Sequence, residues 1–98
     1  MRMLLKATMD TERANQAIRD GTMGKALQDA MARLNPEAAS FYPEDSKRTA
    51  LFVFDLEDPS QLPALTEPFF EIAAANVRVT PVMTADDLRA GLQEIQGG

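Results

Sequence analysis

The segment Arg48-Thr49-Ala50-Leu51-Phe52-Val53-Phe54-Asp55 contains the longest uninterrupted apolar run of the chain, Ala50 to Phe54. Its aromatic and β-branched residues favour a strand. Because both faces of this strand are apolar, we expect it to lie in the middle of a sheet that is covered on both sides. The run is far shorter than the roughly 20 residues that cross a bilayer, so we expect no membrane span.

A hairpin is predicted immediately before this strand. Residues 38–42 form a second candidate strand, and Pro43-Glu44-Asp45-Ser46 separates the two. Proline presets φ for a turn, and the carboxylates of Glu44 and Asp45 can accept hydrogen bonds from nearby backbone. We therefore interpret Pro43 to Ser46 as the hairpin turn.

The first third of the chain predicts a strand followed by a long helix. Residues 2–9 alternate, with Met3, Leu5, Ala7 and Met9 on one face and Arg2, Leu4, Lys6 and Thr8 on the other. Apolar or small residues then recur in steps of three and four from 11 to 34, a helical stripe that Asp10 or Thr11 begins and Asn35-Pro36 ends. Gly21 predicts a kink or break in this helix.

The last third predicts a helix, a strand and a short terminal helix. Asp58-Pro59-Ser60 is typical of a cap before a helix over 61–75, which Pro68 should bend or split. A strand follows over 77–83, and Pro81 confines it to a sheet edge or to its own end. Thr84 and Asp87 resemble a capping box for a helix with the apolar positions Leu88, Leu92 and Ile95. We expect a single domain over 1–96 and a frayed tail at 97–98.

The order β-α-β-β-α-β predicts an α+β fold, the ferredoxin-like antiparallel sheet, with strand order 4-1-3-2 and an extra C-terminal helix. Strands one and three are then central. A central position for strand three agrees with its apolar residues on both faces over 50–54, and an edge position for strand four agrees with its proline.

Two helices cover only one face of such a sheet, which leaves the other face half apolar. A second copy of the chain, packed sheet to sheet across a shared cavity, would cover that face. Alternatively, the terminal helix folds back over it.

The chain resembles small uncharacterised bacterial proteins of the dimeric α+β barrel superfamily. The resemblance spans nearly the whole chain and is carried by the strand with Lys6, Asp10-Thr11, 36–39, the hairpin from Glu44-Asp45 to 47–49, 58–60, 67–70 and 81–83. It implies a ferredoxin-like protomer, a homodimer and a cavity between the two sheets. It implies no particular reaction, because members of that superfamily include isomerases, cofactor-free monooxygenases, haem enzymes and ligand-sensing domains.

Composition restricts the chemistry that we expect. The chain has 10 Lys+Arg against 15 Asp+Glu, a net charge of −5, and its cations are scattered, so we expect no nucleic-acid partner. It contains no Cys and no His, which removes thiolate nucleophiles, His/Cys zinc sites and imidazole acid-base catalysis. We expect no metal and no cofactor. The N-terminal segment lacks the apolar core of a secretory signal, so we expect a cytoplasmic location.

The candidate ligand-binding residues are Lys6, Thr8, Tyr42, Arg78 and Thr80. If strands one and four are antiparallel neighbours, Lys6 and Arg78 lie on the face away from the helices and give the cavity a cationic floor. A small anionic, hydrophobic metabolite is the ligand this arrangement favours. Alternatively, the two cations pair with acidic residues across the dimer or extend into solvent at the rim.

Two functions remain open on the sequence. One is a cofactor-free enzyme that acts by proton transfer, with Lys6, Arg78 and Tyr42 as electrostatic stabilisers and an unidentified carboxylate as base. The other is a non-catalytic binding or sensory module that uses the same cavity.

Overall fold

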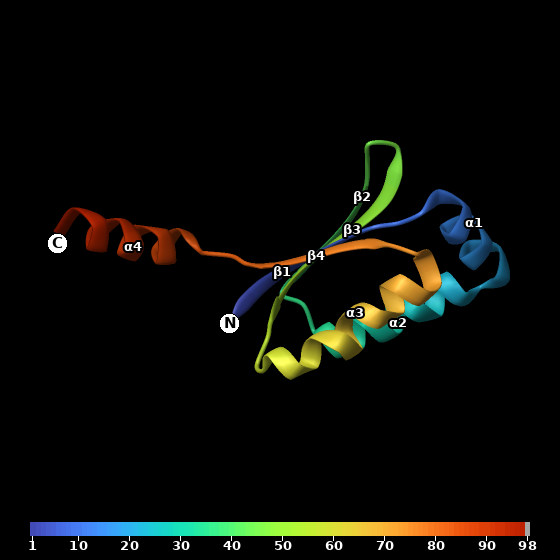
Figure 1. Cartoon of the computed structure of the whole chain (residues 1–98), viewed down its shortest axis with the longest axis horizontal. Coiled ribbons are helices and arrows are strands. Elements are labelled where there is room, and N and C mark those ends of the chain that lie inside the picture. The colour runs from blue at the N-terminus through green and yellow to red at the C-terminus, as the bar shows by residue number, and fades with distance from the viewer. Residues whose placement is uncertain (98) are drawn as a thin grey trace.

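The computed structural model describes residues 1–97 and contains one antiparallel sheet with helices packed against a single face (Figure 1). The strands are β1 (Arg2–Thr8), β2 (Ala38–Glu44), β3 (Lys47–Asp55) and β4 (Asn76–Pro81). The helices are α1 (Thr11–Asp20), α2 (Thr22–Leu34), the short 3₁₀ helix η1 (Pro59–Gln61), α3 (Leu62–Ala73) and α4 (Ala85–Gly97). The strand order is β2-β3-β1-β4, as predicted, with Pro81 at the end of an edge strand.

The core lies between the sheet and helices α1 to α3. Leu5 of β1 pairs with Phe52 of β3, and both side chains are fully buried. The Phe52 ring meets Phe41 of β2 edge-on and lies tilted against Phe69 of α3, with centroid separations of 5.8 Å in both cases. The even-numbered aromatic residues of β3 therefore face the helices, and Leu51 and Val53 face the other side of the sheet.

The helix predicted over 11–34 is two helices, with the break at Gly21. The Asp10 side chain begins α1 by accepting a hydrogen bond from the Arg13 backbone N–H at 3.1 Å. Gly21 ends α1 in the left-handed region, with φ of 84°, a conformation that a side chain would strain. Asn35, also left-handed, ends α2. The predicted start, break and end of this segment are confirmed.

The hairpin is tighter than predicted. Pro43 and Glu44 belong to β2, and the turn consists of Asp45 and Ser46 alone, with φ of 51° and 65°. Two consecutive positive φ values are typical of the two-residue hairpin turn whose backbone twist matches the twist of the flanking strands. Pro43 is tolerated in β2 because β2 is an edge strand. The prediction that Pro43 and Glu44 form the turn is therefore wrong.

Helix α3 is continuous through Pro68, so the predicted split is wrong. A proline at this position cannot donate to the carbonyl of Ala64, four residues earlier. Arg33 of α2 donates to that carbonyl at 3.5 Å and so supplies a replacement partner. The neighbouring helix thereby satisfies a group that Pro68 leaves free.

Helix α4 extends away from the sheet, at the opposite end of the molecule from α1 and the hairpin (Figure 1). The predicted capping box is present, because Asp87 accepts from the Thr84 N–H at 3.0 Å and Thr84 accepts from the Asp87 N–H at 3.1 Å. No residue of α4 is buried, so α4 does not fold back over its own sheet. The helix includes Gly97, and the rest of the predicted tail, Gly98, lies outside the described residues.

Candidate functional site

The predicted ligand-binding residues share the face of the sheet that the helices leave open. Pairing between strands arranges this open face in three adjacent rows, Tyr42-Thr49-Thr8-Asn76, Ser40-Leu51-Lys6-Arg78 and Ala38-Val53-Leu4-Thr80. Lys6 and Arg78 are direct cross-strand neighbours. Leu4, Leu51 and Val53 form an apolar centre beside them, and each remains only partly buried. The open face therefore combines apolar side chains with the adjacent cations Lys6 and Arg78.

Glu44 connects the polar groups of this face. Its carboxylate accepts from Lys6 Nζ at 2.5 Å and from the Tyr42 hydroxyl at 3.3 Å. The hydrogen bond from Lys6 lowers the pKa of Glu44, and the same bond raises the pKa of Lys6. Lys6 thus has an acidic partner within its own chain, an arrangement that neither of the predicted alternatives for this residue included.

The Lys6–Glu44 pair predicts a pH-dependent contribution to stability. The lowered pKa of Glu44 means that its contribution is present above its unfolded pKa and lost as the pH falls through the folded one. The raised pKa of Lys6 means that its contribution is lost as alkaline pH passes the folded value. We expect Glu44→Gln to lower the urea midpoint modestly at neutral pH and not in acid below the lowered pKa. An equal difference at both pH values would contradict the pairing.

Arg78 differs from Lys6 because it forms no ion pair within residues 1–97. Its charge nevertheless acts on the pair, since it lowers the pKa of Glu44 and opposes the rise in that of Lys6. Arg78 is exposed in the single chain. Arg78 is therefore a cation next to Lys6 on the open face that remains available to an anion.

Sequence reasoning missed Glu44, which was interpreted as a turn residue. The signal was present in the alternation Ser40, Tyr42, Glu44, which continues the open-face side of β2 by one more position. Asp58 and Asp87 behave as expected for residues at helix starts. Asp58 accepts from the Ser60 N–H at 2.9 Å, and its pKa, like that of Asp87, is lowered by the backbone N–H that it caps.

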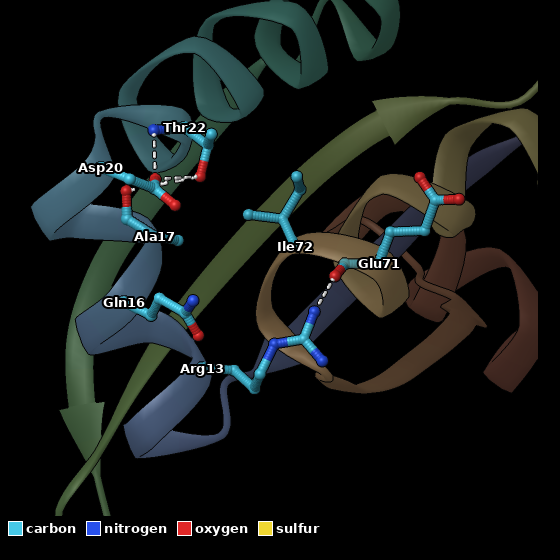
Figure 2. Close-up of a pocket in the computed structure, with 7 residues that line it drawn as sticks. All are labelled: Arg13, Gln16, Ala17, Asp20, Thr22, Glu71 and Ile72. Atoms are coloured by element: carbon cyan, nitrogen blue, oxygen red, sulfur yellow. Dashed lines mark hydrogen bonds between the residues drawn. The ribbon is translucent and has the colours of Figure 1, made fainter.

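A separate cavity of about 310 Å³ lies between α1 and α3, and several of its polar groups form hydrogen bonds with one another (Figure 2). Arg13 donates to the backbone carbonyl of Glu71. Asp20 accepts from both the N–H and the hydroxyl of Thr22, at 3.0 and 2.7 Å, which lowers the pKa of Asp20. These bonds join α1 to α3 and shape the start of α2. We assign no ligand to this cavity.

The comparisons with known proteins define the fold. Within residues 1–97, no helix is long and apolar enough to cross a membrane. No family model and no curated protein matches the chain. Among solved structures, the chain is similar to "De novo designed protein Ferredog-Diesel", with a TM-score of 0.50, 9% sequence identity, and coverage of 83% of this chain and 85% of that chain. Together with the observed strand order, this similarity shows that the chain has a ferredoxin-like α+β fold.

Proposed function

We propose that the chain forms a homodimer in which the open faces of two sheets enclose a chamber, and that this chamber binds a small apolar molecule with an anionic group. The observation that carries the proposal is the apolar centre of the open face beside the unpaired Arg78. Apolar area on a sheet gains about 25 cal/mol per Å² on leaving water. A second copy presents the same patch and can cover it by two-fold symmetry.

The ligand class follows from the charges of the face. Lys6 is paired with Glu44, so its neighbour Arg78 supplies an unpaired charge that attracts an anion. Its planar guanidinium suits a carboxylate or a similar group, while Leu4, Leu51 and Val53 suit an apolar body. Thr8 and Thr80 supply hydroxyl groups on either side of the two cations. The proposal extends the resemblance to bacterial dimeric α+β barrel proteins and includes a cytoplasmic location.

Of the two candidate functions, binding of a ligand without a reaction is better supported than catalysis. Glu44 is the carboxylate that lies beside the proposed ligand residues, and its hydrogen bond to Tyr42 is the feature that favours a proton-transfer enzyme. An effective general base at neutral pH has a pKa near the working pH. The pKa of Glu44 is instead lowered by Lys6, which makes it a weak base. We therefore propose a binding or sensory module first and a cofactor-free enzyme second.

Titration with anilinonaphthalene sulfonate, an apolar anionic fluorophore, tests the proposed anchor. We expect Arg78→Met to weaken binding of this probe by about tenfold or more, because a charge-assisted contact is lost. The double variant Lys6→Met/Glu44→Gln removes the ion pair as a unit and should change the affinity by less than about threefold. Lys25→Met, on α2, is the matched control for loss of one positive charge.

The neutral dye Nile red separates the anionic contact from apolar binding. Its affinity should be the same for the wild type and Arg78→Met. Wild-type affinity of Arg78→Met for the sulfonate probe would contradict the assignment of Arg78. Loss of both dyes in Arg78→Met, with the dimer intact, would show that the residue shapes the chamber instead.

A further inference from the structure

Helix α4 has an apolar stripe without a partner in its own chain. Leu88, Leu92 and Ile95 recur at i, i+4 and i+7, the spacing of one helix face. Their exposed fractions are 47%, 45% and 80%. The helix is well formed, since the Thr84–Asp87 capping box begins it. An amphipathic helix of this kind is stabilised mainly by packing of its apolar face against another apolar surface. We therefore expect the stripe of α4 to pack against such a surface.

A matching apolar groove lies at the other end of the molecule. It opens between α1, α2 and the β2–β3 hairpin, has a volume of about 380 Å³ and is lined almost entirely by apolar atoms. Ile18 and Phe41 line it and are 50% and 55% exposed, and the less exposed Met23 and Leu27 line it as well. We refer to it as the α1–hairpin groove.

The geometry of one chain keeps α4 and the α1–hairpin groove apart. They lie at opposite ends of a molecule that is 56 Å long (Figure 1). A helix of 13 residues is only about 20 Å long. The α4 of the same chain therefore does not reach the groove in this arrangement, whereas that of a second copy is free to do so.

Charge on the two surfaces also favours this match. Arg48 is the charged residue among those that line the α1–hairpin groove, and it forms no ion pair within the part of the chain that the structure describes. Helix α4 carries three acidic residues, Asp86, Asp87 and Glu94, against Arg89, so its net charge is −2. The negative charge of α4 thus complements the cation at the groove.

We propose that α4 is an exchange arm that lays Leu88, Leu92 and Ile95 into the α1–hairpin groove of a second copy, where the net negative charge of the helix faces Arg48. Two-fold symmetry makes the exchange reciprocal, so each dimer contains the contact twice and closes without free arms. This inference rests on the homodimer of the proposed function, and adds a second contact outside the chamber.

Two single variants with opposite charges test the exchange. Leu92→Lys places a cation on the stripe of α4, and Ile18→Glu places an anion in the groove. Each alone disrupts both contacts of the dimer, and we expect each to weaken dimerisation by about tenfold or more in sedimentation velocity. An equimolar mixture can form a dimer with one native contact and one Lys–Glu contact, so we expect affinity to recover to within about threefold of the wild type.

The control variants introduce the same charges at positions outside the apolar stripe and the α1–hairpin groove. Gln93→Lys on α4 and Gln16→Glu on α1 lie outside the stripe and the groove, and should leave the dimer unchanged. Circular dichroism should show an intact fold for all variants, because α4 has no buried residue and Ile18 is half exposed. If either test variant unfolds, Leu88→Lys and Phe41→Glu serve as a second pair.

The outcomes separate the arm from the chamber. An unchanged dimer in both single variants would overturn the exchange and leave the chamber standing. Weakened single variants that do not recover on mixing would also overturn it, because the two surfaces would not meet. Species whose mass grows beyond a dimer would overturn the reciprocal arrangement. A monomeric wild type would overturn both the exchange and the proposed chamber.

Discussion

Phe52→Ala should lower the free energy of unfolding by about 3–5 kcal/mol, because it empties a fully packed site at the centre of the core. Phe52 has no exposed surface, and its ring contacts Phe41 and Phe69. A domain of this size has a total stability of about 5–15 kcal/mol, so the loss is a large part of the whole. Urea denaturation followed by circular dichroism measures it.

Phe70→Ala is the matched control on α3. Phe70 follows Phe69 in the chain but is 45% exposed, so its truncation should cost less than about 1 kcal/mol. Equal losses for Phe52→Ala and Phe70→Ala would contradict the assignment of the helix-facing side of β3 as the core.

Leu51→Lys should dissociate the proposed dimer while the fold is retained. Leu51 lies in the middle of the open face, between Ser40 and Lys6. Two-fold packing would bury a new cation from each copy next to Lys6 and Arg78, and unpaired buried charge is strongly unfavourable. We expect the dissociation constant to rise by about a hundredfold or more. Light scattering coupled to size exclusion measures the change, with circular dichroism as the check on folding.

Gln28→Lys adds the same charge to an exposed position on α2, away from the open face. It should leave the mass in solution unchanged. If Leu51→Lys remained dimeric at the concentrations at which the wild type is dimeric, the open face would not be the main interface.

Much of the fold follows from local patterns. The doubly apolar segment over 50–54 and the proline near the end of β4 place a central and an edge strand, and the observed order agrees with both. Asp10 begins α1 and Gly21 ends it through interactions within one or two helical turns. Capping preferences and backbone preferences therefore suffice to predict both helix ends. The hairpin turn was mispredicted because Asp45 and Ser46 adopt positive φ without a glycine to signal it.

The candidate site depends on distances that the sequence does not encode locally. The alternation of β1 places Lys6 and Thr8 on the open face, and the antiparallel order brings Arg78 beside Lys6. The bond from Lys6 to Glu44 joins residues 38 positions apart and depends on how β2 lies across β3. The position of α4 could not be predicted either, because an apolar stripe indicates that a helix packs but not on which chain.

The central claim is that a second copy covers the open face of the sheet. Isotope-filtered nuclear Overhauser spectroscopy on an equimolar mixture of labelled and unlabelled chains tests it without any substitution. We predict intermolecular signals from the methyl groups of Leu4, Leu51 and Val53, together with a mass twice that of the 10.8 kDa chain. The absence of intermolecular signals from these methyl groups at high micromolar concentration would contradict the account.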